Sequence, residues 1–338
     1  MTPQNTPATD KVEPYFHVRG VVLRPDDFDT LDWVTRAERS GLTTIGTHDP
    51  RAPSVVESYM KSEPGRRLEE KCLAAGIQLE HELHVIKEFL PRDLFKKNPE
   101  LFRMNEEGNR DPKHNCCVTN KHTLEIISDH AARTAIELPP TTGRYLFWID
   151  DNKPMCRCQE CDRLSDTDQA LILENAMLKA VRTVDPKATM AHLSYANTLA
   201  PPKDVKPESG IFLEFVPIER HYMMKLSNRE APGRRGLTHG DILDYLDANL
   251  KIFSPSTTRI LEYWLNARMF YRIARANDFP IFWSPSVFED DLNTYASRGI
   301  RHISCFAAGL NGSYVKEFGE PPIGEYGNLL QQFRPGSS

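Results

Sequence analysis

Short apolar runs that alternate with helical patterns cover most of the 338-residue chain. Strand-like runs, rich in β-branched and aromatic residues, are predicted at residues 15–23, 42–48, 77–85, 144–150, 188–196, 210–218, 259–267 and 300–310. Helical patterns are predicted at residues 26–41, before Gly76, at 167–186 and at 239–253. Eight strands alternating with helices predict a (β/α)8 barrel, the TIM barrel, as a single domain over residues 15–330.

An open, doubly wound α/β sheet is the alternative architecture, but no G-x-G-x-x-G loop follows the first predicted strand. The polar, proline-bearing residues 1–14 are expected to form a disordered lead, and residues 331–338 a short tail. The barrel is therefore the favoured fold class.

Composition narrows the class of protein further. The formal net charge is -5 and no basic block stands out, so nucleic acid is not an expected partner. No apolar run approaches the length of a membrane span, and the N-terminus carries no apolar signal segment. The seven cysteines are odd in number and clustered, which is typical of an intracellular protein, and we expect a cytoplasmic location.

Polar residues gather where the predicted strands end, which is where a barrel of this type carries its chemistry. Carboxylates, amides and aromatic faces at these positions suit a carbohydrate, while no phosphate-binding glycine loop is visible. The candidate substrate-binding residues at these ends are His48, Glu80, Glu82, His84, Tyr195, Asn197, Glu214, Glu262 and Trp264. Ordinary salt bridges remain the alternative for the glutamates, and a core position remains the alternative for Trp148.

Asp150 and Asp151 end the apolar run "YLFWI" and are the candidate catalytic pair. Adjacent strand residues point to opposite faces, so both carboxylates can face the barrel axis only if the strand is already turning. Two carboxylates brought close in a partly desolvated place cannot both ionise easily, so one pKa should rise. We expect Asp151 to be the acid of the pair.

Several segments resemble known families. "HVRGVVL" and "CLAAGIQLEHELHVI" resemble strands of family 20 glycoside hydrolases, and "FWIDD" lies where those enzymes carry an aspartate–glutamate pair. A closer resemblance, over about residues 15–330, is to the uncharacterised domain family numbered 4838, a barrel family related to families 20 and 163. "FLPRDLFKKNPELFRMNEEGN", "CCVTN" and "WIDDNKPMCRCQEC" carry it in order. The second acid here is Asp151 rather than glutamate.

The resemblance implies a retaining glycosidase acting on an (N-acetyl)hexosamine-type or related sugar. In the family 20 mechanism the substrate's acetamido group attacks the anomeric carbon, so Asp150 would orient that group and Asp151 would protonate the leaving oxygen. Arg19, from the arginine–glycine pair of the first strand, and Glu262 would bind sugar hydroxyls, and Trp264 would stack on the ring. For a substrate without an acetamido group, Asp151 would instead pair with Glu262 or Glu82.

The loop after Asp151 carries three cysteines in the spacing C-x-C-x-x-C. Structural zinc takes four ligands, and the resemblance implies that Cys116 or Cys117 supplies the fourth. The expected ligands are Cys117, Cys156, Cys158 and Cys161. A packed loop of reduced thiols is the alternative, and no organic cofactor is expected.

Two other functions remain open. The first is a metal-dependent lyase or isomerase that uses His81, Glu82, His84 and His192, although the sequence has no H-E-x-x-H motif. The second is a carbohydrate-binding barrel without catalysis, which the aspartate in place of glutamate makes plausible. The sequence does not predict an oligomeric state.

Overall fold

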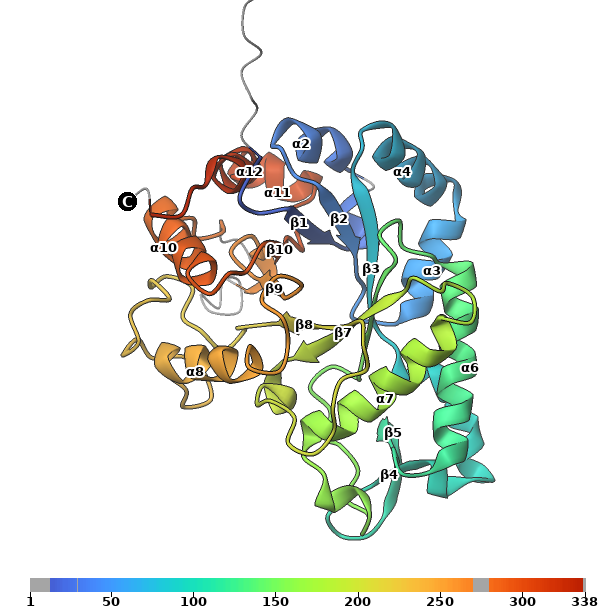
Figure 1. Cartoon of the computed structure of the whole chain (residues 1–338). Coiled ribbons are helices and arrows are strands. Elements are labelled where there is room, and N and C mark those ends of the chain that lie inside the picture. The colour runs from blue at the N-terminus through green and yellow to red at the C-terminus, as the bar shows by residue number, and fades with distance from the viewer. Residues whose placement is uncertain (1–12, 29, 270–279, 337–338) are drawn as a thin grey trace, which may run out of the picture.

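The computed structural model describes residues 13–28, 30–269 and 280–336. Most of the predicted N-terminal lead lies outside these residues. The described residues form a closed barrel of eight strands in which every neighbouring pair runs parallel (Figure 1). The strands are β1 (Val18–Leu23), β2 (Thr44–Thr47), β3 (Gln78–His84), β6 (Arg144–Trp148), β7 (Thr189–Ser194), β8 (Ile211–Phe215), β9 (Arg259–Glu262) and β10 (His302–Phe306). Each overlaps a predicted strand, so the predicted (β/α)8 TIM barrel is confirmed.

Helices surround this barrel on the outside. They are α1 (Pro25–Phe28), α2 (Trp33–Arg39), α3 (Pro53–Lys61), α4 (Glu63–Ala74), α5 (Ile86–Phe89), α6 (Lys121–Glu137), α7 (Asp166–Val181), α8 (His239–Asn249), α10 (Pro285–Ala296), α11 (Gly312–Phe318) and α12 (Ile323–Gln332). Outward-facing strand residues such as Val21, Ile45 and Leu83 are buried in the apolar layer between strands and helices. In the part of the chain that the structure describes, no helix is long and apolar enough to cross a membrane.

Side-chain caps begin the longer helices. Ser165 and Asp168 form a reciprocal capping box at α7, and Thr238 and Asp241 form another at α8. The predicted helix over residues 26–41 is divided in two, because Asp32 accepts a hydrogen bond from the backbone N–H of Thr35 at 3.2 Å and so starts α2 afresh.

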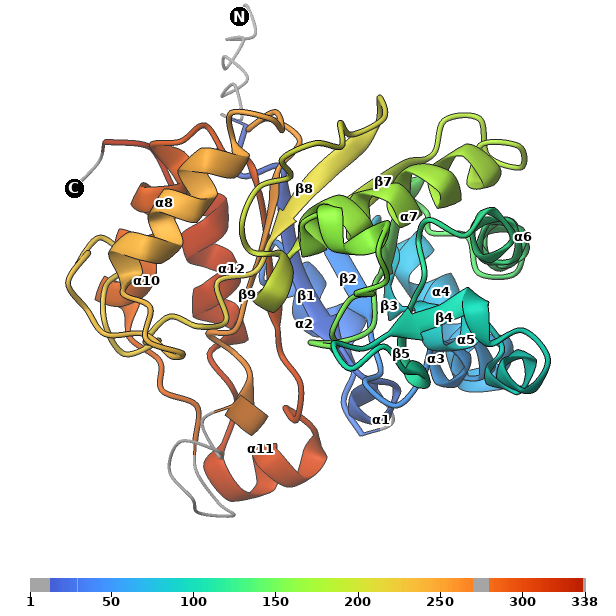
Figure 2. The same ribbon diagram turned by 90° about the horizontal axis from the view of Figure 1, so that it is seen from below.

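The long segment between β3 and β6 carries structure that the sequence pattern did not predict. It contains the 3-10 turns η1 (Arg92–Lys96) and η2 (Pro99–Leu101), an antiparallel hairpin of β4 (Phe102–Met104) and β5 (Arg110–Cys116), and α6. Figures 1 and 2 show the hairpin and α6 on the outside of one sector of the barrel, with α8 and α10 on the opposite side. The remaining 3-10 turns are η3 (Cys161–Arg163) and η4 (Ala196–Thr198).

Candidate active site

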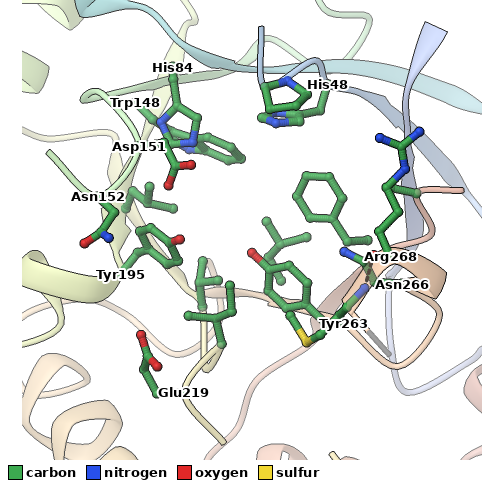
Figure 3. Close-up of a pocket in the computed structure, with 18 of the residues that line it drawn as sticks. His48, His84, Trp148, Asp151, Asn152, Tyr195, Glu219, Tyr263, Asn266 and Arg268 are labelled. Atoms are coloured by element: carbon green, nitrogen blue, oxygen red, sulfur yellow. Dashed lines mark hydrogen bonds between the residues drawn. The ribbon is translucent and has the colours of Figure 1, made fainter. Parts of the chain in front are cut away.

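A pocket of about 530 Å³ opens at the carboxyl ends of the barrel strands (Figure 3). Most of its lining residues lie at the ends of the strands or in the loops that follow them. The lining residues are Arg24, His48, Pro50, His84, Trp148, Asp151, Asn152, Leu193, Tyr195, Val216, Ile218, Glu219, Arg234, Arg235, Leu261, Tyr263, Asn266, Arg268, Met269, Phe306 and Ala308. The pocket therefore occupies the place at which barrels of this class carry their chemistry.

Strand alternation decides which polar residues reach this pocket. Along β3, Glu80, Glu82 and His84 face the barrel axis, but only His84 lies high enough to line the pocket. Along β9, Arg259 lies inside the barrel below, and Leu261 and Tyr263 line the pocket in turn. Residues between these positions face the helices instead.

Asp151 and Glu219 are the two carboxylates among the described lining residues, and Tyr195 lies between them (Figure 3). Burial, followed by the charges of Asp151 and Glu219, raises the pKa of the Tyr195 hydroxyl above its usual value. That hydroxyl therefore stays protonated at neutral pH and is a hydrogen-bond donor for Asp151.

Two histidines line the pocket in neutral form. Nδ1 of His48 lies 2.8 Å from the Glu82 carbonyl, and Nδ1 of His84 lies 2.5 Å from the Ile149 carbonyl. A carbonyl only accepts, so each Nδ1 carries the proton and each Nε2 is left as an acceptor. Burial, with the neighbouring His84, lowers the pKa of His48 to about 3, and burial lowers the pKa of His84 as well.

Aromatic side chains form the apolar part of the pocket. Trp148 packs beside His84, with ring centroids 5.1 Å apart, and Tyr263 stacks on Phe306 at 5.4 Å. The indole N–H of Trp148 donates to Glu214 at 2.9 Å, which fixes the ring's orientation. Trp148 is thus both a packed residue and part of the pocket wall.

The backbone around the pocket contains unusual conformations. In the described chain the three residues other than glycine with positive φ are Asn152 (49°), Ala196 (51°) and Arg235 (54°). Asn152 and Arg235 line the pocket, and Ala196 directly follows Tyr195. Such conformations are commonly concentrated at functional sites, where the surrounding structure holds them in place.

Asp150 does not accompany Asp151 into the pocket, so the geometry does not support the predicted pair. Its carboxylate accepts from the backbone N–H of Lys87 at 2.9 Å and from Arg92 at 3.1 Å, on the side away from the pocket. Burial raises the pKa of Asp150, while Arg92 opposes that rise. Strand β6 ends at Trp148, and the chain bends at Asp150 and turns at Asp151, so the two neighbouring side chains enter different surroundings.

Glu80, Glu82 and Glu214 also lie outside the pocket, in the barrel interior beneath it. Arg259 contacts all three: its Nη1 lies 2.7 Å from Glu80, its Nη2 contacts Glu82 and its Nε lies 3.3 Å from Glu214. Arg144 adds a second ion pair with Glu80 at 2.6 Å. This is the salt-bridge alternative, and the geometry does not support direct substrate contact by these three glutamates.

Burial and repulsion between the carboxylates raise the pKa of Glu82 to about 8 and that of Glu214 to about 7, against the opposing charge of Arg259. Gly46 makes room for this ionic cluster, because a Cβ there would lie 2.9 Å from Oε1 of Glu82.

Glu262 and Trp264 face the helix layer rather than the pocket. Glu262 accepts from Arg220 at 2.8 Å and from the Tyr295 hydroxyl, and the Trp264 indole donates to Asp291 at 2.9 Å. All of these side chains are buried. Neither residue is positioned to bind or stack on a sugar in the pocket.

Arg19 and Asn197 are engaged elsewhere too. The Arg19 guanidinium donates to the carbonyls of Phe16 and Gly41, each at 2.7 Å, between β1 and its surrounding segments. The Asn197 amide donates to Asp166 at 2.8 Å. Their positions do not support the predicted roles in substrate binding.

The residues of the metal-dependent alternative are not brought together. His81 bonds Thr47 at 2.7 Å and His192 bonds Glu174 at 2.7 Å, both on the outer side of the strands. His84 lies in the pocket and Glu82 lies below it. Within residues 13–28, 30–269 and 280–336, the cysteine cluster is the one group with the spacing of a metal site.

That cluster consists of Cys117, Cys156, Cys158 and Cys161, whose sulfur atoms all lie within 4.8 Å of one another. Sγ of Cys117 is 3.7 Å from Sγ of Cys158 and 3.8 Å from Sγ of Cys161. A zinc ion about 2.3 Å from each of four sulfurs in a tetrahedron would separate them by about 3.8 Å. The predicted cysteines therefore meet with the spacing that a metal needs.

Asn115, a residue of β5 two positions before Cys117, connects the cysteine cluster to the pocket. The Asn115 side chain accepts from the backbone N–H of Asp150 at 2.9 Å and donates to the Lys153 carbonyl at 3.0 Å. On the other side of the loop, the side-chain amide of Gln169 in α7 accepts from the backbone N–H of Cys156 and donates to its carbonyl, each at 3.1 Å. The turn that presents Asp151 is thus braced from both ends.

Some pocket residues were outside the predicted site. Glu219 and Tyr263 lie just after strand ends, and Arg24 directly follows the first strand, so position alone could have indicated them. Arg234 and Arg235 come from a loop far along the chain from any strand end, and the pattern gave no signal for them.

The fold and the site define a (β/α)8 barrel with a pocket of mixed acidic, basic and aromatic lining. Solved structures with this fold include a β-galactosidase from Marinomonas ef1, at 10% identity and a TM-score of 0.57, and a tri-modular family 5 endo-β-1,4-glucanase from Bacillus licheniformis, at 11% and 0.54. The matches cover 93% and 95% of this chain but 58% and 60% of those chains, which is less than two-thirds.

A family 20 β-N-acetylglucosaminidase also aligns, at 9% identity over 95% of this chain and 70% of its own, with a TM-score of 0.49. No curated protein matches the sequence significantly. The chain belongs to the family described as domain of unknown function 4838, whose model matches residues 49–239, and the predicted family resemblance is confirmed.

Proposed function

We propose that the protein is a glycoside hydrolase in which Asp151 is the general acid and Glu219 is the second carboxylate. The observation that carries the proposal is the pairing of these two acids on either side of Tyr195 in a pocket at the carboxyl ends of the barrel strands. Glycoside hydrolysis needs two carboxylates flanking the scissile bond. The proposal replaces Asp150 with Glu219 and keeps the predicted role of Asp151.

In this proposal the two acids have different tasks. Asp151 is exposed to the pocket and protonates the leaving glycosidic oxygen. Glu219 is buried, with Nε of Arg235 at 3.1 Å from its carboxylate, and is the group that acts at the anomeric carbon or orients an acetamido group. The protonated Tyr195 hydroxyl lies between them and donates to Asp151.

The remaining lining suits a sugar ring. The faces of Trp148 and Tyr263 offer an apolar platform for C–H groups, and Nε2 of His48 and of His84 accepts from hydroxyls. The amide of Asn152 adds donors and an acceptor. A retaining mechanism and an (N-acetyl)hexosamine substrate stay predictions that follow from the family 20 resemblance.

We further propose that the cysteine cluster holds a structural zinc ion. Four sulfur ligands fill a tetrahedron and leave no position for a reacting water, so the metal would stabilise the loop and take no part in the chemistry. The backbone N–H of Met104 and the guanidinium of Arg110 lie 3.3 and 3.8 Å from Sγ of Cys156, and such donors offset the charge of bound thiolates.

The test is turnover of a panel of aryl glycosides, including N-acetylglucosaminides, galactosides, glucosides and glucuronides, with and without a chelator. We expect hydrolysis of at least one member, unchanged in rate during brief exposure to the chelator. The double variant Asp151→Asn, Glu219→Gln should be inactive yet folded. Binding of a sugar without hydrolysis of any substrate would instead indicate a carbohydrate-binding barrel, and metal-dependent turnover would favour the lyase or isomerase.

A further inference from the structure

The pocket lining carries more positive than negative charge. Four arginines, Arg24, Arg234, Arg235 and Arg268, face two carboxylates, and the two lining histidines are neutral. Arg24 is buried, and a buried guanidinium is costly to desolvate without an anion, so a pocket for an uncharged sugar does not account for this excess.

Two of these arginines already have an anionic partner in the pocket. Nε of Arg235 lies 3.1 Å from Glu219 and Nε of Arg234 lies 3.8 Å from the same carboxylate. Their charge is directed at Glu219, the second carboxylate of the proposed pair. The excess positive charge of the pocket therefore comes from the other two arginines, Arg24 and Arg268.

Arg24 is buried, with 6% of its surface exposed, and its Nε has no hydrogen-bond partner. Its nearest anion is Asp49, at 3.6 Å from Nη2. Arg51 already occupies the Asp49 carboxylate, with contacts of 2.8 and 2.6 Å. Arg24 thus keeps unused donors at the wall of the pocket.

Arg268 lies in the same part of the wall. The Asp27 carboxylate accepts from the backbone N–H of Arg24 at 3.0 Å and from that of Gly309 at 3.2 Å. Gly309 in turn packs against Arg268, whose Cγ would lie 3.2 Å from an added Cβ. Figure 3 shows Arg268 and Asn266 across the pocket from Asp151.

We propose that the wall formed by Arg24 and Arg268 binds an anionic substituent of the sugar, either the carboxylate of a uronic acid or a sulfate ester. The planar guanidinium fork matches the paired oxygens of both groups. The acidic wall of Asp151 and Glu219 would then face the glycosidic bond while the basic wall holds the charged substituent. This inference rests on the proposal that the pocket binds a carbohydrate.

The test measures binding, so it does not depend on turnover. Two matched pairs of ligands are titrated calorimetrically into the full-length protein: methyl β-D-glucuronide against methyl β-D-glucoside, and N-acetylglucosamine 6-sulfate against N-acetylglucosamine. We expect the charged member of one pair to bind at least about tenfold more tightly than its neutral partner. The pair that shows the preference identifies the carboxylate or the sulfate as the natural group.

Substitutions of the two arginines test whether they cause the preference for the charged ligand. Arg24→Gln and Arg268→Gln should each reduce the difference between the members of the pair by about tenfold, and Arg67→Gln, an identical change on exposed α4, should not. If Arg24→Gln fails to fold, the exposed Arg268 still provides the test. Equal affinities in both pairs, or a preference that survives the pocket variants, would overturn the inference.

The two proposals fail in different ways. Anion-dependent sugar binding without hydrolysis of any glycoside would contradict the proposed enzyme and support the basic wall. Hydrolysis of neutral glycosides without any anion preference would support the enzyme and contradict the basic wall.

Discussion

Asp150 and Asp151 are neighbours in the chain with opposite surroundings. Asp150 is 5% exposed and is held by Arg92 and the Lys87 backbone, whereas Asp151 is exposed at the pocket. The first arrangement suits a carboxylate that supports the fold, and the second suits one that meets a substrate. The two aspartates therefore have different roles, although they share the same side chain and are neighbours in the sequence.

Asp150→Asn should lower the free energy of unfolding by about 1–3 kcal/mol, because the substitution removes the charged partner of half-buried Arg92. Asp151→Asn is the matched control and should change stability by less than about 0.5 kcal/mol, as surface substitutions usually do. Urea unfolding followed by circular dichroism measures both. A larger loss for Asp151→Asn than for Asp150→Asn would mean that the roles are reversed.

The loop between β6 and α7 is the element on which the site depends most. It carries Asp151 at its start and three of the four clustered cysteines further along, and Asn115 ties it to β5. A metal in the cluster would fix the loop at several points, since ligand binding and folding are coupled in such sites.

Purified protein should contain about one zinc ion per chain, which elemental analysis measures directly. Cys158→Ser and Cys161→Ser should lose the metal and lower the melting temperature, because three ligands hold zinc far more weakly than four. Cys72→Ser, in α4 and outside the cluster, should keep it. Zinc-free protein in which all four clustered thiols react freely would rule the metal out.

The strands could be predicted because apolar runs of strand length recur between helical patterns, and all eight were found. The hairpin β4–β5 could not, since its segment "RDPKHNC" is polar and mostly half-buried, with no alternation to mark it. The residues of the site were harder to predict than the strands. Strands of a parallel barrel are buried on both faces, so Glu262, facing the helices, and Glu82, facing the axis, look alike in sequence.

At the scale of the whole molecule, the barrel interior contains Glu80, Glu82 and Glu214 around Arg259, with Arg144 at the edge. Three carboxylates against two guanidiniums leave one charge unbalanced in a buried place. The raised pKa values of Glu82, about 8, and Glu214, about 7, indicate that the folded barrel retains a proton there near neutral pH.

Stability should therefore fall as pH rises from about 7.5 to 8.5. In this window an unfolded glutamate, with a pKa of about 4.3, is fully ionised, so the folded state binds more protons than the unfolded state and the free energy of unfolding decreases with pH. Buried histidines such as His48, with a pKa of about 3, act in the opposite direction at lower pH, because unfolded histidine, with a pKa of about 6.5, still binds protons up to about pH 7.5.

Urea unfolding at intervals between about pH 7.5 and 8.5 measures this slope, which is at most about 1.4 kcal/mol per pH unit for each proton retained. Glu214→Gln should flatten it, because the amide cannot titrate. Glu208→Gln, an exposed change beside Lys179, should leave it as it is. Stability that rises with pH across this window would show that the cluster is fully ionised in the folded protein.

The most direct test of the central claim is the rate of Asp151→Asn on two substrates that share a sugar and differ only in the leaving group. A missing general acid matters most where the leaving oxygen needs protonation, and it typically costs about 10²- to 10⁴-fold in rate. We predict a loss of that size on an oligosaccharide or alkyl glycoside and a far smaller loss on the dinitrophenyl glycoside. Equal losses on both substrates, or full activity of Asp151→Asn on the oligosaccharide, would contradict the assignment of Asp151 as the acid.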